Sequence, residues 1–128
     1  MRTRALVAAT AFACALFAET RYEAAEAVFA RAPQKARARR NPLETNALAA
    51  VAGKKLFEQH CAECHGAMEE GSRRGPALRD EAVGRAAPGE IFWVLTNGVV
   101  RKGMPAWAKL PEGERWQIVR FLGESGAK

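Results

Sequence analysis

The residues best suited to chemistry lie together in the stretch HCAECHG, residues 60–66. The chain of 128 residues holds three cysteines and two histidines, and four of these five residues fall within six consecutive positions. Cys61 and Cys64 are three positions apart, and His65 follows the second cysteine directly. Thiols and imidazoles clustered in this way indicate a metal or cofactor site.

Two common uses of paired cysteines fit this sequence poorly. A structural zinc site takes four ligands, usually as two pairs separated by a dozen or more residues, and no second pair follows downstream. A thioredoxin-type C-x-x-C lies in a βαβ setting, which the pattern of this chain does not provide. C-x-x-C-H is instead the attachment signature of c-type haem. Each thiol forms a thioether with one vinyl group of the porphyrin, and the histidine that follows becomes the proximal iron ligand.

The second axial position of such an iron has few candidates. Met68 is only three residues past His65 and cannot reach the opposite face, and His60 lies on the same side as His65. Met104 lies 39 residues downstream of His65 in the stretch KGMPAW, where Pro105 stiffens the backbone. A lone methionine often fills a gap in a core, but the loop position and the lack of a rival favour Met104 as the distal ligand. We therefore expect His65 and Met104 to bind the metal.

The elements that must position these residues have the periodicity of helices. We predict helices over residues 47–60, 87–98 and 111–125, and loops over residues 68–80 and 99–110. In the first helix, Ala50, Gly53 and Phe57 form one inward stripe. No stretch alternates with period two, so we predict an all-α domain. Because so small a domain gains little stability from its apolar core alone, one covalently bound haem would complete the core between the short helices.

The first 45 residues are expected to lie outside this domain. Arg2 and Arg4 precede an uncharged, mostly apolar run, residues 5–18, which is too short to cross a bilayer and has the character of a secretory signal peptide. We predict three parts, namely a signal peptide over residues 1–18 that is lost together with Cys14, a basic flexible segment and linker over residues 19–45, and a haem domain over residues 46–128.

The net charge of +6 is concentrated in the N-terminal part of the chain. Residues 1–40 hold eight basic residues against three acidic ones, and the rest of the chain is nearly neutral. The calculated isoelectric point of 9.7 therefore does not indicate a basic folded surface. With no nucleic-acid motif in the sequence, we expect no nucleic-acid partner.

In these motifs, residues 46–125 resemble a class I cytochrome c, whose fold consists of short helices packed around one covalently bound haem. The strings GEIFWVLTNGVVRKGMPAW and LPEGERWQIVRFL are similar to those of small bacterial monohaem cytochromes found alongside quinoprotein dehydrogenases. The resemblance implies that the Pro76 carbonyl accepts a hydrogen bond from the proximal His65 and that Leu78 packs on the haem. It also implies that Gly53 and Phe57 cross the C-terminal helix. The cofactor-binding set is thus expected to be Cys61, Cys64, His65, Pro76, Leu78 and Met104.

The function implied is that of an exported electron carrier in the periplasm, without catalytic residues of its own. Its single covalent haem c would shuttle electrons between a dehydrogenase donor and an oxidase or other cytochrome acceptor. We expect a monomer that contacts a membrane only through a tether. Two alternatives remain open, namely a haem subunit fixed in a dehydrogenase or oxidase complex, and an open-site haem that acts as a peroxidase or sensor.

Overall fold

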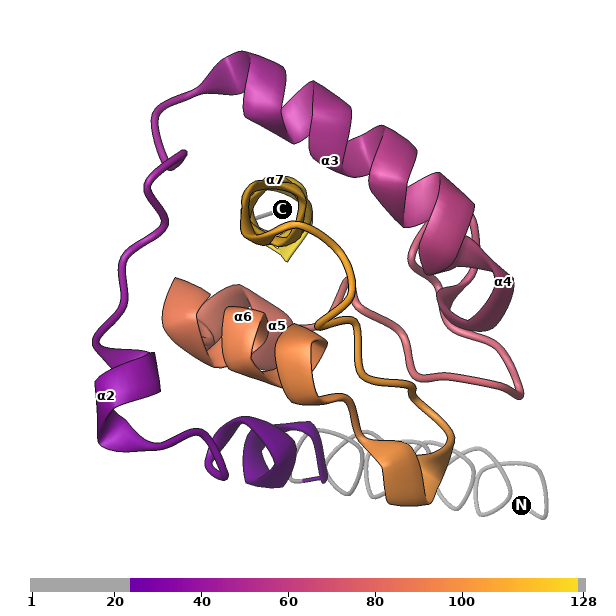
Figure 1. Cartoon of the computed structure of the whole chain (residues 1–128). Coiled ribbons are helices and arrows are strands. Elements are labelled where there is room, and N and C mark those ends of the chain that lie inside the picture. The colour runs from indigo at the N-terminus through magenta and orange to yellow at the C-terminus, as the bar shows by residue number, and fades with distance from the viewer. Residues whose placement is uncertain (1–23, 127–128) are drawn as a thin grey trace, which may run out of the picture.

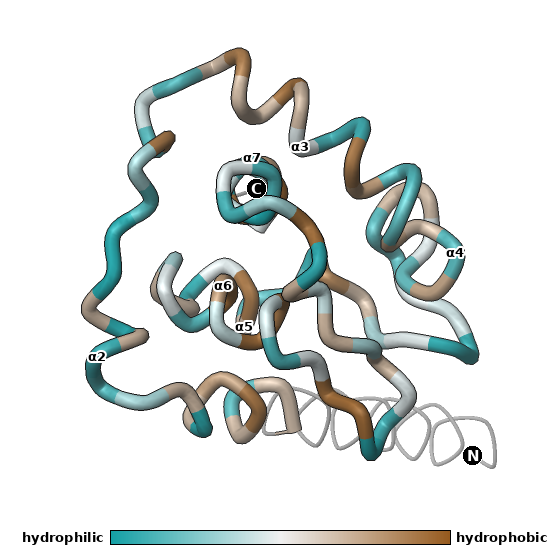
Figure 2. The backbone as a smooth tube through the Cα atoms, viewed as in Figure 1, coloured by the Kyte–Doolittle hydropathy of each residue, from teal (hydrophilic) through white to brown (hydrophobic). Residues whose placement is uncertain are grey.

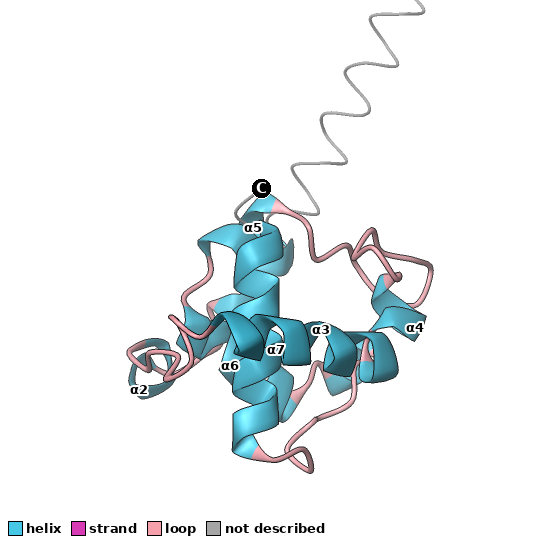
Figure 3. Ribbon diagram, turned by 90° about the horizontal axis from the view of Figure 1, so that it is seen from above, coloured by secondary structure: helices cyan, strands magenta, loops and turns pink. Residues whose placement is uncertain are grey.

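The computed structural model describes residues 24–126, and every regular element in this part of the chain is helical (Figure 1). Besides a helical turn at residues 24–29, the elements are α2 (Gln34–Arg37), α3 (Ala47–His60), α4 (Ala62–His65), α5 (Glu81–Arg85), α6 (Pro88–Asn97), the 3-10 helix η1 (Val100–Lys102) and α7 (Glu112–Gly126). Figure 3 shows these helices joined by loops, with no strand in the described part. The predicted all-α class is confirmed, and the first of the three predicted helices has the predicted bounds.

The N-terminal prediction falls partly outside the described residues. The predicted signal peptide, residues 1–18, lies outside them, and so does Cys14. Among residues 24–126, none of the helices has both the length and the apolar character needed to cross a membrane.

Helix α3 begins at a side-chain cap and packs across α7. The Oδ1 atom of Asn46 accepts hydrogen bonds from the amides of Leu48 and Ala49 at 3.0 and 3.2 Å, which satisfies two free donors of the first turn. In Figure 1 α7 is seen along its axis while α3 runs across the view. At the crossing a Cβ atom on Gly53 would overlap the backbone carbonyl of Gln117, so the helices approach this closely only because residue 53 is glycine.

The predicted inward stripe of α3 is confirmed. Ala50, Gly53 and Phe57 are buried. The Phe57 ring lies 5.4 Å from that of Phe121 on α7, as the family resemblance implied. These contacts fix the start of the C-x-x-C-H stretch, because that stretch follows the last turn of α3.

One apolar core joins α3, α5, α6 and α7. Its buried members are Phe57, Val83, Ile91, Phe92, Leu95, Trp116, Ile118, Val119 and Leu122. Burial of each large apolar side chain stabilises the fold by about 1.5–3 kcal/mol. In Figure 2 hydrophobic segments recur along these helices, whereas the segment between α2 and α3 is mostly hydrophilic.

Helix α5 is an element that the sequence analysis missed. Asp80 caps it, because its Oδ1 atom accepts a hydrogen bond from the amide of Val83 at 3.0 Å. Ala82 and Val83 are buried. The helix has only five residues, which is too short for a hydrophobic period to stand out in the sequence.

The stretch from about Ala32 to Leu43 belongs to the segment predicted as a flexible linker, and in the structure it packs against α6 and α7. Ala32 is 2% exposed and Asn41 is 6% exposed. Asn41 donates from Nδ2 to the carbonyl of Trp116 at 3.0 Å, and its Oδ1 atom accepts from the amide of Leu43 at 2.9 Å. Helix α2 lies so close to α6 that a Cβ atom on Gly89 would overlap a carbonyl of the α2 region. The domain boundary at residue 46 stays a prediction.

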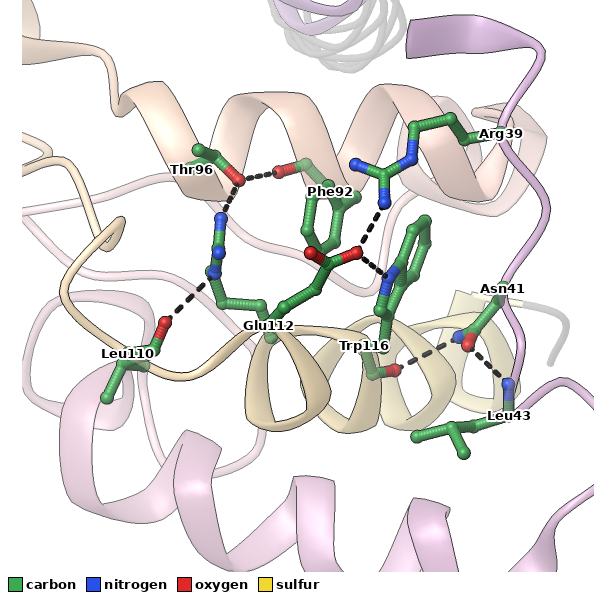
Figure 4. A network of polar contacts seen from close by, with 9 residues as sticks. Arg39, Asn41, Leu43, Phe92, Thr96, Leu110, Glu112 and Trp116 are labelled. Atoms are coloured by element: carbon green, nitrogen blue, oxygen red, sulfur yellow. Dashed lines mark hydrogen bonds and ion pairs between the residues drawn. The ribbon is translucent and has the colours of Figure 1, made fainter.

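Two basic residues of this stretch, Arg37 and Arg39, are held in specific contacts. Arg39 donates to Glu112 of α7 at 2.5 Å, and its guanidinium lies 4.6 Å from the Phe92 ring centroid and 5.1 Å from that of Trp116 (Figure 4). The Nε atom of Arg37 donates to the carbonyl of Ala32 at 2.8 Å. Their positive charge suggested a solvated tether, but a guanidinium stacks on aromatic faces as well as it binds carboxylates.

Candidate haem-binding site

The C-x-x-C-H stretch forms a single tight turn at the end of α3. The amide of Cys61 donates to the carbonyl of Phe57 at 2.8 Å, and the amide of His65 donates to the carbonyl of Cys61 at 2.9 Å. Gly66 ends α4 with a φ of 84°, a conformation that favours glycine. Both Cys61 and Cys64 are free thiols of intermediate exposure. The turn therefore presents two thiols and one imidazole from five consecutive residues.

His65 is oriented by a backbone carbonyl. The residue is 8% exposed, and its Nδ1 atom lies 2.8 Å from the carbonyl oxygen of Pro76. A carbonyl oxygen only accepts, so Nδ1 carries the proton and Nε2 carries the lone pair that a metal ligand needs. Such an acceptor also fixes the ring orientation. The hydrogen bond that the resemblance implied is present, whereas a role of Pro76 in haem binding stays a prediction.

The loop after α4 is folded back onto the motif by several bonds. The hydroxyl of Ser72 donates to the carbonyl of Cys64 at 2.6 Å, and the amide of Gly71 donates to the carbonyl of His65 at 2.7 Å. A Cβ atom on Gly75 would lie 3.0 Å from the Cys64 carbonyl oxygen and 3.2 Å from the His65 ring. Glycine at position 75 thus lets the backbone lie against the imidazole. The sequence analysis missed Ser72 and Gly75, because their partners are known only once the loop is folded.

The same loop brings Leu78 back to the core. Its amide donates to the carbonyl of Glu69 at 2.9 Å. Glu69 has a φ of 59° and is 6% exposed, so the loop turns sharply at a buried residue. Leu78 is partly buried and packs against the apolar core.

The segment that holds Met104 is shaped by backbone bonds. The amide of Val99 donates to the carbonyl of Met104 at 3.0 Å, and the amide of Met104 donates back at 3.2 Å, which encloses η1 in a small loop. Gly98 precedes this loop and Gly103 lies within it, with φ values of 69° and 91°. The amide of Trp107 donates to the carbonyl of Leu95 in α6 at 3.0 Å.

Aromatic packing places the methionine loop beside the motif. The Trp107 ring lies 5.2 Å from the ring of His60, the residue before Cys61. Met104 is partly buried and packs against the same core as Cys61 and Leu78. Figure 1 shows α4 at the end of the molecule opposite to α2.

The rival methionine of the sequence analysis has a different environment. Met68 is 62% exposed, whereas Met104 packs against the core. The elimination of Met68 as a distal ligand is therefore consistent with the fold, although the ligand role of Met104 itself stays a prediction.

The Cys61 thiol lacks the lowered pKa of a redox-catalytic cysteine. Burial, with a smaller effect from Cys64, raises the pKa of the Cys61 thiol to about 11. Catalytic C-x-x-C cysteines have a lowered pKa, because the thiolate is their nucleophile. Among residues 24–126 no three histidine, cysteine or acidic side chains cluster as an all-protein metal site. One oriented imidazole, two thiols and an apolar surround fit a haem, which brings its own iron and is largely apolar.

Comparisons with known proteins agree with this arrangement. The chain contains a c-type cytochrome domain. It belongs to the family described as cytochrome C oxidase, cbb3-type, subunit III, whose model matches residues 48–122. The cofactor of such a domain is covalently bound haem c, and Cys61 and Cys64 have the spacing of its attachment motif.

A solved structure supports the same fold. Cytochrome CL from the marine methylotrophic bacterium Methylophaga aminisulfidivorans MPT is similar, with a TM-score of 0.55 and 29% sequence identity. The similarity covers 65% of this chain and 57% of that chain, so this chain spans less than two thirds of that protein. No curated protein matches the chain. The predicted cytochrome c fold is confirmed.

Proposed function

We propose that this chain is an exported, periplasmic electron carrier whose haem is attached through Cys61 and Cys64 and ligated by His65 and Met104. The observation that carries the proposal is the hydrogen bond between Nδ1 of the buried His65 and the carbonyl of Pro76. It leaves Nε2 as the free donor nitrogen in a fixed orientation, which is the arrangement of a proximal ligand. When bound, haem c supplies a one-electron couple between ferric and ferrous iron.

The chain would hold this group, shield it and supply a second ligand to its iron. Thioethers at Cys61 and Cys64 fix the cofactor next to the last turn of α3. Leu78 and Trp107, one on each loop, pack against the apolar core and would shield the cofactor from water. The thioether sulfur of Met104 would be the second protein ligand and would leave the iron without a site for a substrate. Because electron transfer needs no acid, base or nucleophile, we propose a carrier rather than an enzyme.

Electrons would pass in short encounters with a dehydrogenase donor and with an oxidase or another cytochrome as acceptor. Such transient contacts bury less than about 1,200 Å² in total. Arg101 and Lys102 of η1 are exposed three and two residues before Met104, and Val100 beside them is 70% exposed. An apolar centre beside positive charge suits a partner with an acidic rim. Arg74 on the other loop is engaged by Glu63 and contributes less to this surface.

A fixed subunit of an oxidase or dehydrogenase complex is the second candidate. The family description, which names an oxidase subunit, favours it. Copurification of the chain with a larger complex at high salt would support this candidate, whereas a monomeric haem protein in the soluble periplasmic fraction supports the free carrier.

The decisive experiment uses the protein expressed with its leader in a host that attaches c-type haem. Denaturing electrophoresis with haem staining and intact mass are expected to show one covalently bound haem, because thioethers survive denaturation. Reduced and oxidised spectra then report the axial ligands. A far-red band in the ferric form and no carbon monoxide binding in the ferrous form are expected for His65 and Met104. Ready binding of carbon monoxide would favour a peroxidase or sensor instead.

A further inference from the structure

The Arg115 side chain joins the two ends of the loop that holds Met104. Its Nη1 atom donates to the hydroxyl of Thr96 at 2.5 Å, and its Nε atom donates to the carbonyl of Leu110 at 3.1 Å (Figure 4). Thr96 lies in the last turn of α6, directly before the loop, and Leu110 is the last residue before the segment that enters α7. The two bonds therefore tie the start and the end of the loop together through Arg115, which lies on α7.

The guanidinium is held in place by its surroundings. It lies 4.8 Å from the centroid of the Phe92 ring, and that ring stacks on Trp116 at 4.0 Å. The Thr96 hydroxyl also donates to the Phe92 carbonyl at 2.7 Å, so its lone pairs point to Arg115. The planar guanidinium can stack on the ring and donate from two separate nitrogen atoms, whereas lysine offers a single nitrogen that does not stack.

Backbone bonds hold the middle of the same loop. The Trp107 amide donates to the carbonyl of Leu95 at 3.0 Å, and the Leu110 amide donates to the carbonyl of Trp107 at 3.0 Å. The Val99–Met104 bridge then fixes the methionine relative to these bonds. Loss of the hydrogen bond from Arg115 to Leu110 would free the C-terminal end of the loop. Movement of this end would displace Trp107 and, through it, Met104.

We propose that Arg115 is a positioning residue that keeps the Met104 thioether at the iron by closing this loop. The inference rests on the proposed function, in which Met104 is the distal ligand. In the holoprotein, a ligand from solution competes with the thioether for the sixth position. The affinity for such a ligand therefore measures how well the loop holds Met104.

The test compares Arg115→Gln with Arg120→Gln in the haem-loaded protein. Arg120 is a matched control, because it also lies on α7, is partly buried and forms an ion pair, with Glu124 at 2.8 Å. We expect Arg115→Gln to bind imidazole in the ferric state about tenfold more tightly than the parent, which corresponds to about 1.4 kcal/mol. Its far-red band should weaken, whereas Arg120→Gln should keep the parent affinity and band. Arg115→Lys keeps the positive charge, so its imidazole affinity should fall between those of the parent and Arg115→Gln. It replaces the glutamine variant in the test if that variant loads haem poorly.

Amide hydrogen exchange gives a readout that does not depend on the axial ligand. Exchange at the Trp107 amide should be about tenfold faster in Arg115→Gln than in Arg120→Gln, because local opening of the loop exposes it. If the parent has the far-red band and the two variants match in imidazole affinity and in exchange, Arg115 only supports packing and the inference is overturned. If the parent itself lacks the band and binds carbon monoxide, the ligand role of Met104 fails, and this inference fails with it.

Discussion

Replacing Gly98 by alanine should disturb the loop that presents Met104. Gly98 has a φ of 69° and a ψ of −177°, a backbone conformation that is essentially restricted to glycine. A Cβ atom there would lie 2.6 Å from the carbonyl carbon of Pro105 and 2.7 Å from the carbonyl oxygen of Met104. Both neighbours are backbone atoms, so the loop itself must move to make room. The substitution therefore combines backbone strain with a displacement of the methionine.

The effect of backbone strain and the effect of the steric overlap can be separated by comparing Gly98 with a second glycine. Backbone strain of this kind costs about 1–3 kcal/mol, and each kcal/mol lowers the Tm of a domain of this size by about 4–8 °C. Gly103 also has a positive φ, 91°, but a Cβ atom there would meet nothing within 4 Å. Gly103 is in the left-handed region, so Gly103→Ala should carry a strain of about 1–2 kcal/mol without the overlap. Gly113→Ala, on α7 and also in open space, should be neutral or stabilising by up to about 1 kcal/mol.

The assay is thermal unfolding of the haem-loaded protein, followed by circular dichroism and by the far-red band. Gly98→Ala should lower the Tm by more than Gly103→Ala does, and it should weaken the band at temperatures well below unfolding. Gly103→Ala should lower the Tm by roughly 5–15 °C and keep the band. Equal losses of Tm with both bands intact would refute the argument that residue 98 controls the position of Met104.

Three further outcomes are expected. Met104→Ala should lower the reduction potential and open the sixth position to carbon monoxide, because a thioether favours ferrous iron; Met68→Ala, at a 62% exposed position, should leave spectrum and potential unchanged, and equal effects of the two would contradict the ligand assignment. A hydrogen bond from Arg39, with a smaller one from Trp116, holds the pKa of Glu112 below its ordinary value of 4.5. The stabilising contribution of this carboxylate is present above that value and is lost as the pH falls through the lowered pKa. The Tm difference between the parent and Glu112→Gln should therefore shrink on acidification. A constant difference from pH 7 to pH 3 would argue against a stabilising Arg39–Glu112 pair. Arg101→Glu should slow electron transfer to an acidic partner at low salt, and the difference should vanish near 0.5 M salt, where screening acts within about 5 Å; a rate independent of ionic strength would exclude this docking surface.

The sequence by itself determined the chemistry and the main helices. The order of Cys61, Cys64 and His65 points to one cofactor, because the two thioethers and the proximal ligand must come from one turn of chain. The helix over residues 47–60 was predictable because its cap and its apolar stripe are local features. The fold class followed from the same periodicity, since no stretch alternates as a strand would.

The tertiary structure alone decided which polar residues hold the loops and the N-terminal stretch. Arg39 meets Glu112 across 73 positions, and Asn41 meets the Trp116 carbonyl across 75. A basic stretch interrupted by proline has the composition of a linker. Composition alone does not show which distant residues such a stretch contacts in the folded chain. The same holds for Arg115, whose two acceptors lie on either side of the methionine loop. Such roles depend on groups that come together only when the helices have packed, and a hydrogen bond between distant residues leaves no period or spacing in the sequence.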